Sequence, residues 1–159
     1  MFDIFKINKW ILLVLIVISP FITHFLMMTP DFYLEIGIKA MSIILLIYWY
    51  YSIDIRISKK INVLIKLLYI YMAIYPIIFL AYFFPITTIN SGQPEFLYVM
   101  PFHISYMIFF ITLLIRISKK MKEVLNTSDA FWKLLFYPIG IVLFHPQMNK
   151  KNLIMNYEK

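Results

Sequence analysis

Two histidines and two carboxylates are the residues of this chain that could do chemistry as a group. His24 and His103 lie near the ends of two apolar segments, and Glu35 and Glu95 lie in the polar stretches beside those ends. Two imidazoles and two carboxylates on one side of a helical bundle could bind a divalent metal or form a pH-sensitive cluster. The simpler interpretation, which we favour, is that His24 bonds a helix carbonyl or a tyrosine and His103 lies at the level of lipid headgroups.

Other signatures of catalysis are missing from the sequence. It contains no HExxH, Walker, GxGxxG or GxSxG motif. It also contains no cysteine, which excludes a disulfide scaffold, a thiolate zinc site and a cysteine nucleophile. We therefore expect no catalytic residue, no cofactor and no enzymatic activity. A membrane-embedded enzyme built on His24 and His103 ranks last among the functions considered.

The composition predicts an integral membrane protein. Of the 159 residues, 62% are hydrophobic and 14% are charged, and the mean hydropathy is +0.81. Soluble domains have about 45–50% apolar and about 25% charged residues. A spanning helix needs about 20 mostly apolar residues. Four segments without an internal carboxylate qualify: residues 10–28, 36–53, 67–86 and 96–115. The expected fold class is an all-α membrane protein, with a four-helix transmembrane bundle over residues 1–120.

The distribution of basic residues predicts how the chain is oriented. Of 15 Lys and Arg residues, all but Lys39 precede the first segment, separate the second from the third, or follow the fourth. Basic loops stay in the cytoplasm, so both termini should be cytoplasmic, and Lys39 should snorkel outward. The first segment has no small-residue cleavage site and should be a retained helix. We expect the protein in a bacterial inner membrane.

Aromatic and basic residues mark the expected membrane interfaces. Aromatic belts form at both headgroup levels, although a chain this rich in Tyr and Phe would place some there in any case. The inner belt should contain Trp10, Trp49, Tyr50, Tyr51 and Trp132, and the outer belt Tyr82, Phe83, Phe84, Tyr98 and Phe102. Lysines of the inner interface are Lys59, Lys60, Lys119 and Lys120. Contact with anionic lipid accounts for the net charge of +7, and no nucleic-acid partner is expected.

A short internal repeat suggests how the four helices are related. Residues 55–60 read IRISKK, and residues 115–120 read IRISKK again. Glu35 and Glu95 stand at the same offset of 60 positions. These matches suggest two parallel helical-hairpin repeats. The alternative is that segments beside a membrane converge on Ile followed by Lys or Arg.

The chain after the fourth segment has a different character. Residues 121–159 should form an amphipathic segment on the cytoplasmic side, followed by a basic tail. The apolar stretch Ala130–His145 is short for a span and contains Pro138 and Gly140. We expect an interfacial or re-entrant helix with a kink at Pro138 and with His145 at the interface. A fifth span is the alternative, which would place the last lysines outside.

Two elements in the last third of the chain resemble a known group. Pro101-Phe102-His103 and the stretch FYPIGIVLFHPQMNK (residues 136–150) are similar to a late P-[LF]-H element and a C-terminal P-I-G-I…P-x-x-N element. These elements are found in uncharacterised small integral membrane proteins of the Bacteroidetes type. The second match includes Pro138, Gly140, Pro146 and Asn149, but the usual Trp is Val142 here. The resemblance implies a lineage and no mechanism.

The sequence favours a non-enzymatic protein that acts through protein–protein contacts in the membrane. Its role could be that of a subunit, an accessory protein, a sensor or an immunity-type protein, with a second copy or another membrane protein as partner, in addition to the lipid bilayer. The alternative is an oligomeric channel or small-solute permease, because one four-helix bundle encloses little space.

Overall fold

The computed structural model describes residues 3–20, 22, 32–58, 60–80, 94–127 and 129–149, and of residues 32–33, 94–98 and 149 it describes the backbone alone. The described part is helical and contains no strand. Its elements are the 3-10 turn η1 (Ile4–Lys6), α1 (Lys9–Leu13), the π-helical turn η2 (Val14–Ile18), α3 (Phe32–Ser58), α4 (Val63–Ile78), α6 (Pro94–Leu125), α7 (Ala130–Leu135) and α8 (Tyr137–Asn149).

Two of the described helices are long and apolar enough to cross a membrane. They are Leu34–Ser58 in α3 and Val99–Leu125 in α6. The predicted segments 36–53 and 96–115 lie within α3 and α6. The apolar helices Lys9–Ile18 and Val63–Ile78 are shorter, and the predicted segments 10–28 and 67–86 continue beyond them into residues outside the described part.

The helix termini follow local chemistry. The side chain of Asn8 accepts a hydrogen bond from the Trp10 amide at 2.9 Å, and Asn62 caps α4 in the same way. Helix α6 continues through the second IRISKK copy to Leu125, ten residues beyond the predicted end. It stops before Asn126, whose φ of 51° is the left-handed conformation that commonly ends a helix.

The π-helical turn η2 contacts α3 through the carbonyl group of Leu15. The Ser19 amide bonds to Val14 rather than to Leu15, and Pro20 has no N–H to offer the Leu15 carbonyl. Two hydroxyls satisfy that carbonyl instead: Ser19 Oγ donates at 2.7 Å and Ser42 Oγ of α3 at 2.9 Å. A small serine at position 42 therefore permits close packing of the two helices.

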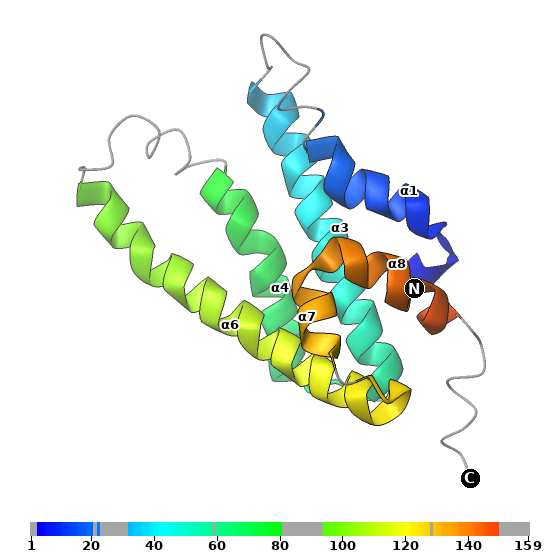
Figure 1. Ribbon diagram of the computed structural model, residues 1–159. Helices are drawn as coiled ribbons and strands as arrows, with labels where there is room; N and C mark the ends of the chain where they lie inside the picture. Colours follow the sequence, from blue (N-terminus) through cyan, green and yellow to red (C-terminus); the bar gives the residue numbers. More distant parts are fainter. Residues whose placement is uncertain are drawn as a thin grey trace.

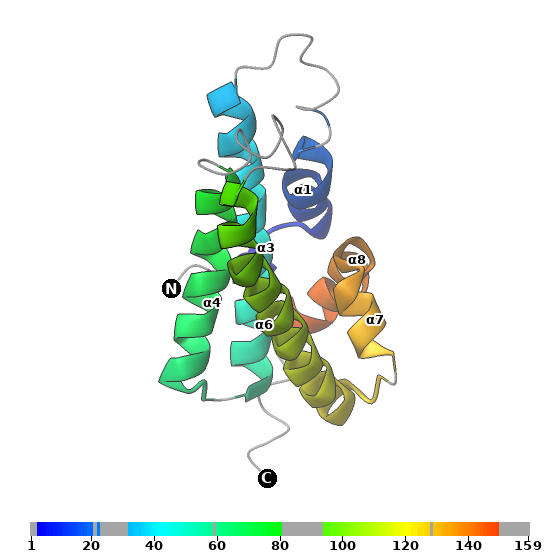
Figure 2. The same ribbon diagram turned by 90° about the vertical axis from the view of Figure 1, so that its left-hand side faces the viewer.

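The C-terminal helices α7 and α8 lie between α1 and α6 (Figures 1 and 2). Helix α3 packs against η2, α4 and α6, whereas α7 packs on α6 and α8 packs on α1. In an up-down bundle the first and fourth helices can be neighbours. In the described residues α7 and α8 lie between α1 and α6, so these two helices are separated by the C-terminal pair.

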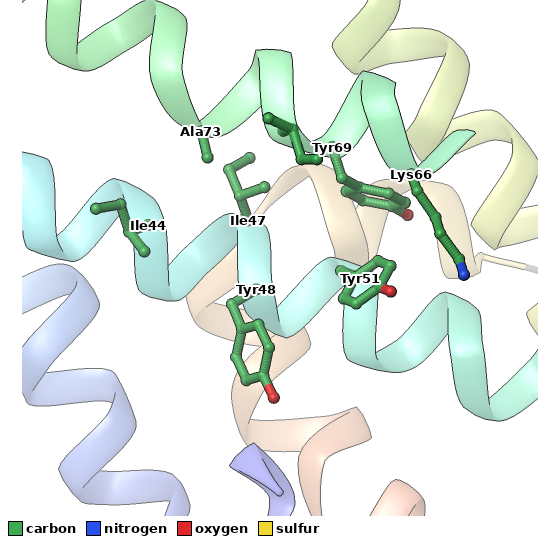
Figure 3. A pocket seen from close by; sticks show the side chains of 8 residues that line it. Ile44, Ile47, Tyr48, Tyr51, Lys66, Tyr69 and Ala73 are labelled. Atoms are coloured by element: carbon green, nitrogen blue, oxygen red, sulfur yellow. The ribbon is translucent and has the colours of Figure 1, made fainter. Parts of the chain in front are cut away.

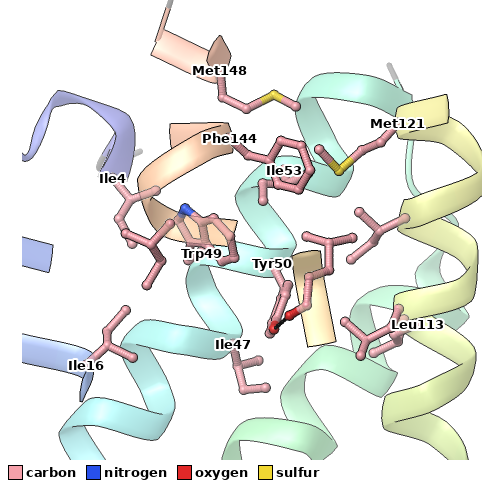
Figure 4. Packing of buried hydrophobic residues seen from close by; sticks show 14 of the residues in the cluster. Ile4, Ile16, Ile47, Trp49, Tyr50, Ile53, Leu113, Met121, Phe144 and Met148 are labelled. Carbon is pink, nitrogen blue, oxygen red and sulfur yellow. Dashed lines mark hydrogen bonds between the residues drawn. The ribbon is translucent and has the colours of Figure 1, made fainter. Parts of the chain in front are cut away.

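The core lies where α3, α6 and the C-terminal pair meet (Figure 4). Its largest fully buried side chains include Trp49, Tyr50, Phe5 and Phe144. The Tyr50 hydroxyl donates to the Leu134 carbonyl of α7 at 2.6 Å. The prediction that Trp49 and Tyr50 belong to the inner aromatic belt was wrong, because α7 and α8 cover the face of α3 that carries them.

The C-terminal segment forms two helices, and its placement as an interfacial or re-entrant segment stays a prediction. The helical conformation is interrupted at Phe136, and Pro138 lies in the first turn of α8. Proline fits there because the amide at that position would have no partner within the helix. The predicted kink at Pro138 is therefore absent. Both helices bury side chains in the core, namely Ala130, Leu134, Ile141, Phe144 and Met148. Packing on the long helices, not a polar face, determines the orientation of this segment.

Candidate functional site

The predicted histidine and carboxylate group is only partly described. His24 lies outside the described residues, and of Glu95 only the backbone is described. His103 is exposed on α6, where its Nδ1 lies 3.4 Å from the Tyr75 hydroxyl. Glu35 pairs with Lys39 one turn along α3. Within the described part of the chain, no group of three His, Cys, Asp or Glu side chains could hold a metal ion.

The predicted interface residues differ in their surroundings. Trp10 and Trp132 are exposed, as are Lys60 and Lys119, while Lys59 lies outside the described residues. Lys120 turns inward, and its ammonium donates to Ser58 Oγ at 2.6 Å. Lys120 therefore belongs to a polar cluster between helices rather than to the exposed interface.

Asp54 is the centre of a buried ionic cluster at one end of α3, α4 and α6. Its carboxylate is fully buried. Oδ2 accepts a hydrogen bond from Arg116 Nε at 3.2 Å and from the Tyr69 hydroxyl at 3.3 Å, and Oδ1 accepts from Ser58 Oγ. The cluster formed by Asp54, Ser58, Tyr69, Arg116 and Lys120 therefore joins three helices.

The two IRISKK copies form most of this cluster. Arg116 and Ser58 belong to the second and first copies, and Lys120 closes the second. The pairs Asp54–Arg116 and Ser58–Lys120 are both separated by 62 residues. The second pair lies about one helical turn further along both helices than the first. Helices α3 and α6 therefore run side by side and parallel at this end.

The electrostatics of the cluster make its partners interdependent. A carboxylate removed from water carries a large desolvation cost unless it is paired and hydrogen-bonded. Asp54 has a guanidinium and two hydroxyls in contact, which offset that cost. Loss of the guanidinium would leave a buried carboxylate without a cation in direct contact.

A second ion pair fixes both ends of the described chain to α3. Arg56 Nη2 donates to both carboxylate oxygens of Asp3, at 2.7 and 2.8 Å, and its Nη1 donates to the Met148 carbonyl in the last turn of α8. The guanidinium also lies 4.3 Å from the centre of the Phe5 ring. A cation at the carbonyl end of α8 stabilises the helix dipole as well.

His145 lies in the core between η1 and α8, not at the interface as predicted. Its Nε2 is 2.7 Å from the Ile7 carbonyl, while its Nδ1 is buried and has no hydrogen-bond partner among the described residues. Because a carbonyl oxygen can only accept, Nε2 is the nitrogen that donates in this contact. Burial lowers the pKa of His145 below its ordinary value of 6.5; the Ile7 carbonyl and Asp3 oppose this shift, whereas Arg56 and Lys9 add to it.

Acidification should therefore destabilise the protein through His145. A histidine with a pKa lowered by folding binds its proton more readily in the unfolded chain, so stability is complete above pH 6.5 and falls as the pH drops below that value. Thermal unfolding followed by circular dichroism between about pH 8 and about pH 5 checks this. His145→Gln should flatten the profile, whereas the matched His103→Gln should retain it. An unchanged slope in His145→Gln would contradict the assignment.

One feature of the sequence could have indicated the ionic cluster. Asp54 follows the predicted segment 36–53 directly and precedes the first IRISKK copy. A carboxylate at the end of an apolar run, with an arginine in each repeat copy, is a candidate for a buried pair. Because the arginines and lysines that flank the segments were expected at the headgroup level, the prediction missed this pairing.

Comparison with protein-family models, with curated proteins and with solved structures finds no match to this chain. The resemblance to the Bacteroidetes-type group therefore stays a prediction. The structure places its two elements in different environments. Pro101-Phe102-His103 is exposed on α6, whereas Pro138 and Gly140 belong to the packed C-terminal pair.

Proposed function

We propose that the protein is a non-enzymatic, four-span protein of a bacterial inner membrane, with both termini in the cytoplasm, and that it acts through contacts with other membrane proteins. The two candidate spanning helices and the predicted continuation of the two shorter ones support the membrane placement. The contact surface is assigned to one turn of α6.

That turn comprises Met100, Pro101, Phe102, His103 and Ile104, all of which are exposed. Five consecutive residues exceed the 3.6 residues of a helical turn, so no side chain at this level is buried. The imidazole of His103 touches the rings of Tyr75 and Phe79 but stays exposed. A helix that faces lipid on one side and its own bundle on the other would bury one stripe. The uncovered turn is the observation on which the proposed contact rests.

The chemistry of the turn favours a protein partner over lipid. Pro101 has no N–H, so α6 cannot form the usual hydrogen bond to the carbonyl four residues earlier. In a membrane, such freed groups are commonly satisfied by neighbouring helices. Phe102 adds a large exposed aromatic side chain, a residue type that is enriched at protein interfaces.

Phe102→Ala should weaken the association without unfolding the protein. Phe102 is 61% exposed, so truncation removes little of the protein's own packing. We expect the amount of copurifying partner or of homo-oligomer to fall by about fivefold or more, as for an aromatic anchor. Met41→Ala on α3, where Met41 is 58% exposed, is the matched control. Equal losses in both variants would contradict the assignment of the contact to this turn.

The direct test is purification of the tagged protein in mild detergent, with the native mass and the copurifying chains read together. A stoichiometric second protein supports the proposed role and identifies the partner. A monomer that retains no other chain, from membranes solubilised under several mild conditions, overturns it.

The proposed topology has its own test. A reporter fused after Lys159 should be active only if that reporter functions in the cytoplasm, because the basic residues place the C-terminus there. Activity of a periplasmic reporter at the same position would contradict the four-span arrangement.

One observation favours the alternative of an oligomeric channel or small-solute permease. A cavity of about 300 Å³ lies among η2, α3 and α8, and its lining includes the polar side chains of Lys39, Ser42 and Tyr137. If the native mass shows a homo-oligomer alone, ion or solute flux in liposomes becomes the deciding measurement. Lys39→Met should then alter the flux, because Lys39 is the cation of that lining.

A further inference from the structure

A groove between α3 and α4 has the properties of a binding site (Figure 3). Its volume is about 320 Å³. Its lining comes from two helices and is almost wholly apolar or aromatic: Ile44, Ile47, Tyr48 and Tyr51 from α3, and Lys66, Tyr69, Ile70 and Ala73 from α4. The neighbouring outward residues of α4, such as Leu67 and Ile74, are exposed, so the groove opens onto the surface that the proposed function places in lipid.

Apart from the Tyr48 hydroxyl, which points away from the others, the polar groups of the lining gather at one end. Lys66 lies in the first turn of α4, and Figure 3 shows its ammonium beyond the hydroxyls of Tyr51 and Tyr69. Ile44 and Ala73 lie at the opposite end. The groove therefore has a cationic mouth and an apolar interior, which complement the anionic headgroup and the acyl chain of an amphiphile.

The residues that the structure describes do not neutralise the charge at the mouth. Lys66 forms no ion pair within the described residues, whose ion pairs join other groups. The acidic group of α3 at this end, Asp54, is fully buried and paired with Arg116, and it already accepts the hydrogen bond of Tyr69. Lys60, in the connection between α3 and α4, is exposed and adds positive charge.

We propose that this groove binds one anionic phospholipid, with an acyl chain along Ile44, Ile47 and Ala73 and the phosphate at Lys66. This inference rests on the membrane placement in the proposed function. In that placement Lys66 lies at the cytoplasmic headgroup level, where anionic lipids attract lysines and basic pockets between helices hold their headgroups. A partner helix would be too wide for a groove between two helices in direct contact. The single cationic end at Lys66 also matches a lipid headgroup better than it matches a helix.

Native mass spectrometry of the purified protein tests the site. The delipidated protein is titrated with phosphatidylglycerol and with phosphatidylcholine of the same acyl chains. One phosphatidylglycerol should bind about fivefold more tightly than one phosphatidylcholine, as expected for one lysine at the surface. Lys66→Gln should abolish the preference and Lys66→Arg should keep it. Ala73→Phe, which fills the apolar end, should reduce binding of both lipids.

The controls separate this site from the general charge of the protein. Lys122→Gln removes an exposed lysine of α6 outside the groove and should leave the preference unchanged. Equal affinity for both lipids in the unmodified protein, an equal effect of Lys122→Gln, or displacement of the lipid by inorganic phosphate would overturn the proposal. If the protein stays in carbonate-washed membranes but shows no lipid preference, only the lipid site is contradicted. If the wash releases the protein, the proposed membrane function itself is contradicted.

Discussion

Replacement of Arg116 by methionine should destabilise the protein by about 3–5 kcal/mol, the range measured when one partner of a buried ion pair is removed. Arg116 supplies the guanidinium that contacts the fully buried carboxylate of Asp54. Methionine keeps most of the aliphatic length of the side chain, so the loss isolates the charge. The free energy of unfolding in detergent, obtained from denaturant titration, measures it.

The double variant distinguishes the ion pair from simple packing. Asp54→Leu combined with Arg116→Met removes both charges, and we expect it to recover most of the stability that Arg116→Met loses. Lys133→Met is the control, because Lys133 pairs with the exposed Asp129 at 2.7 Å and exposed pairs contribute little. If Arg116→Met costs no more than Lys133→Met, the cluster does not hold the three helices together.

Alanine should destabilise the protein at Gly140 but not at Gly37, the other described glycine. A Cβ at Gly140 would lie 2.5 Å from the Lys133 carbonyl oxygen and 3.2 Å from Trp49 Cη2. The first contact is with backbone, so α8 must move away from α7. Overpacking of this kind costs about 1–3 kcal/mol, which exceeds the ~1 kcal/mol that alanine gains over glycine in a helix.

Gly37 provides the matched control within α3. A Cβ at Gly37 would have no neighbour within 4 Å. Gly37→Ala should therefore be neutral or stabilise the protein by up to about 1 kcal/mol. Thermal unfolding of both variants in the same detergent compares them. A stable Gly140→Ala variant would mean that α7 and α8 do not pack as closely as the structure shows.

The sequence predicts the helical class well and the packing of the helices poorly, for a physical reason. Hydropathy depends only on local composition, so the apolar runs 36–53 and 96–115, which lie within α3 and α6, are evident from the sequence. Which face of a helix is covered depends on distant residues. Tryptophan is a residue type that anchors helices at membrane interfaces, and Trp49 is a core residue only because α8 covers that face of α3.

The candidate sites show the same distinction. The histidines and outer glutamates stand out by residue type alone, although His103 contacts aromatic rings and Glu35 pairs with Lys39. Asp54 does not stand out, because it lies one residue beyond a predicted span. Its importance comes from Arg116, which is 62 positions away and reaches it only because α3 and α6 run in parallel.

The dependence of the core on its last helix has a consequence for biosynthesis. Arg56 bonds to Met148, and His145 bonds to Ile7 across 138 positions, so both contacts form only after α8 has been synthesised. The earlier helices can form during translation, but the face of α3 that carries Trp49 stays uncovered until α8 has been made. A chain truncated before residue 137 would leave that face exposed, so we expect it to be degraded faster than a chain that contains α8.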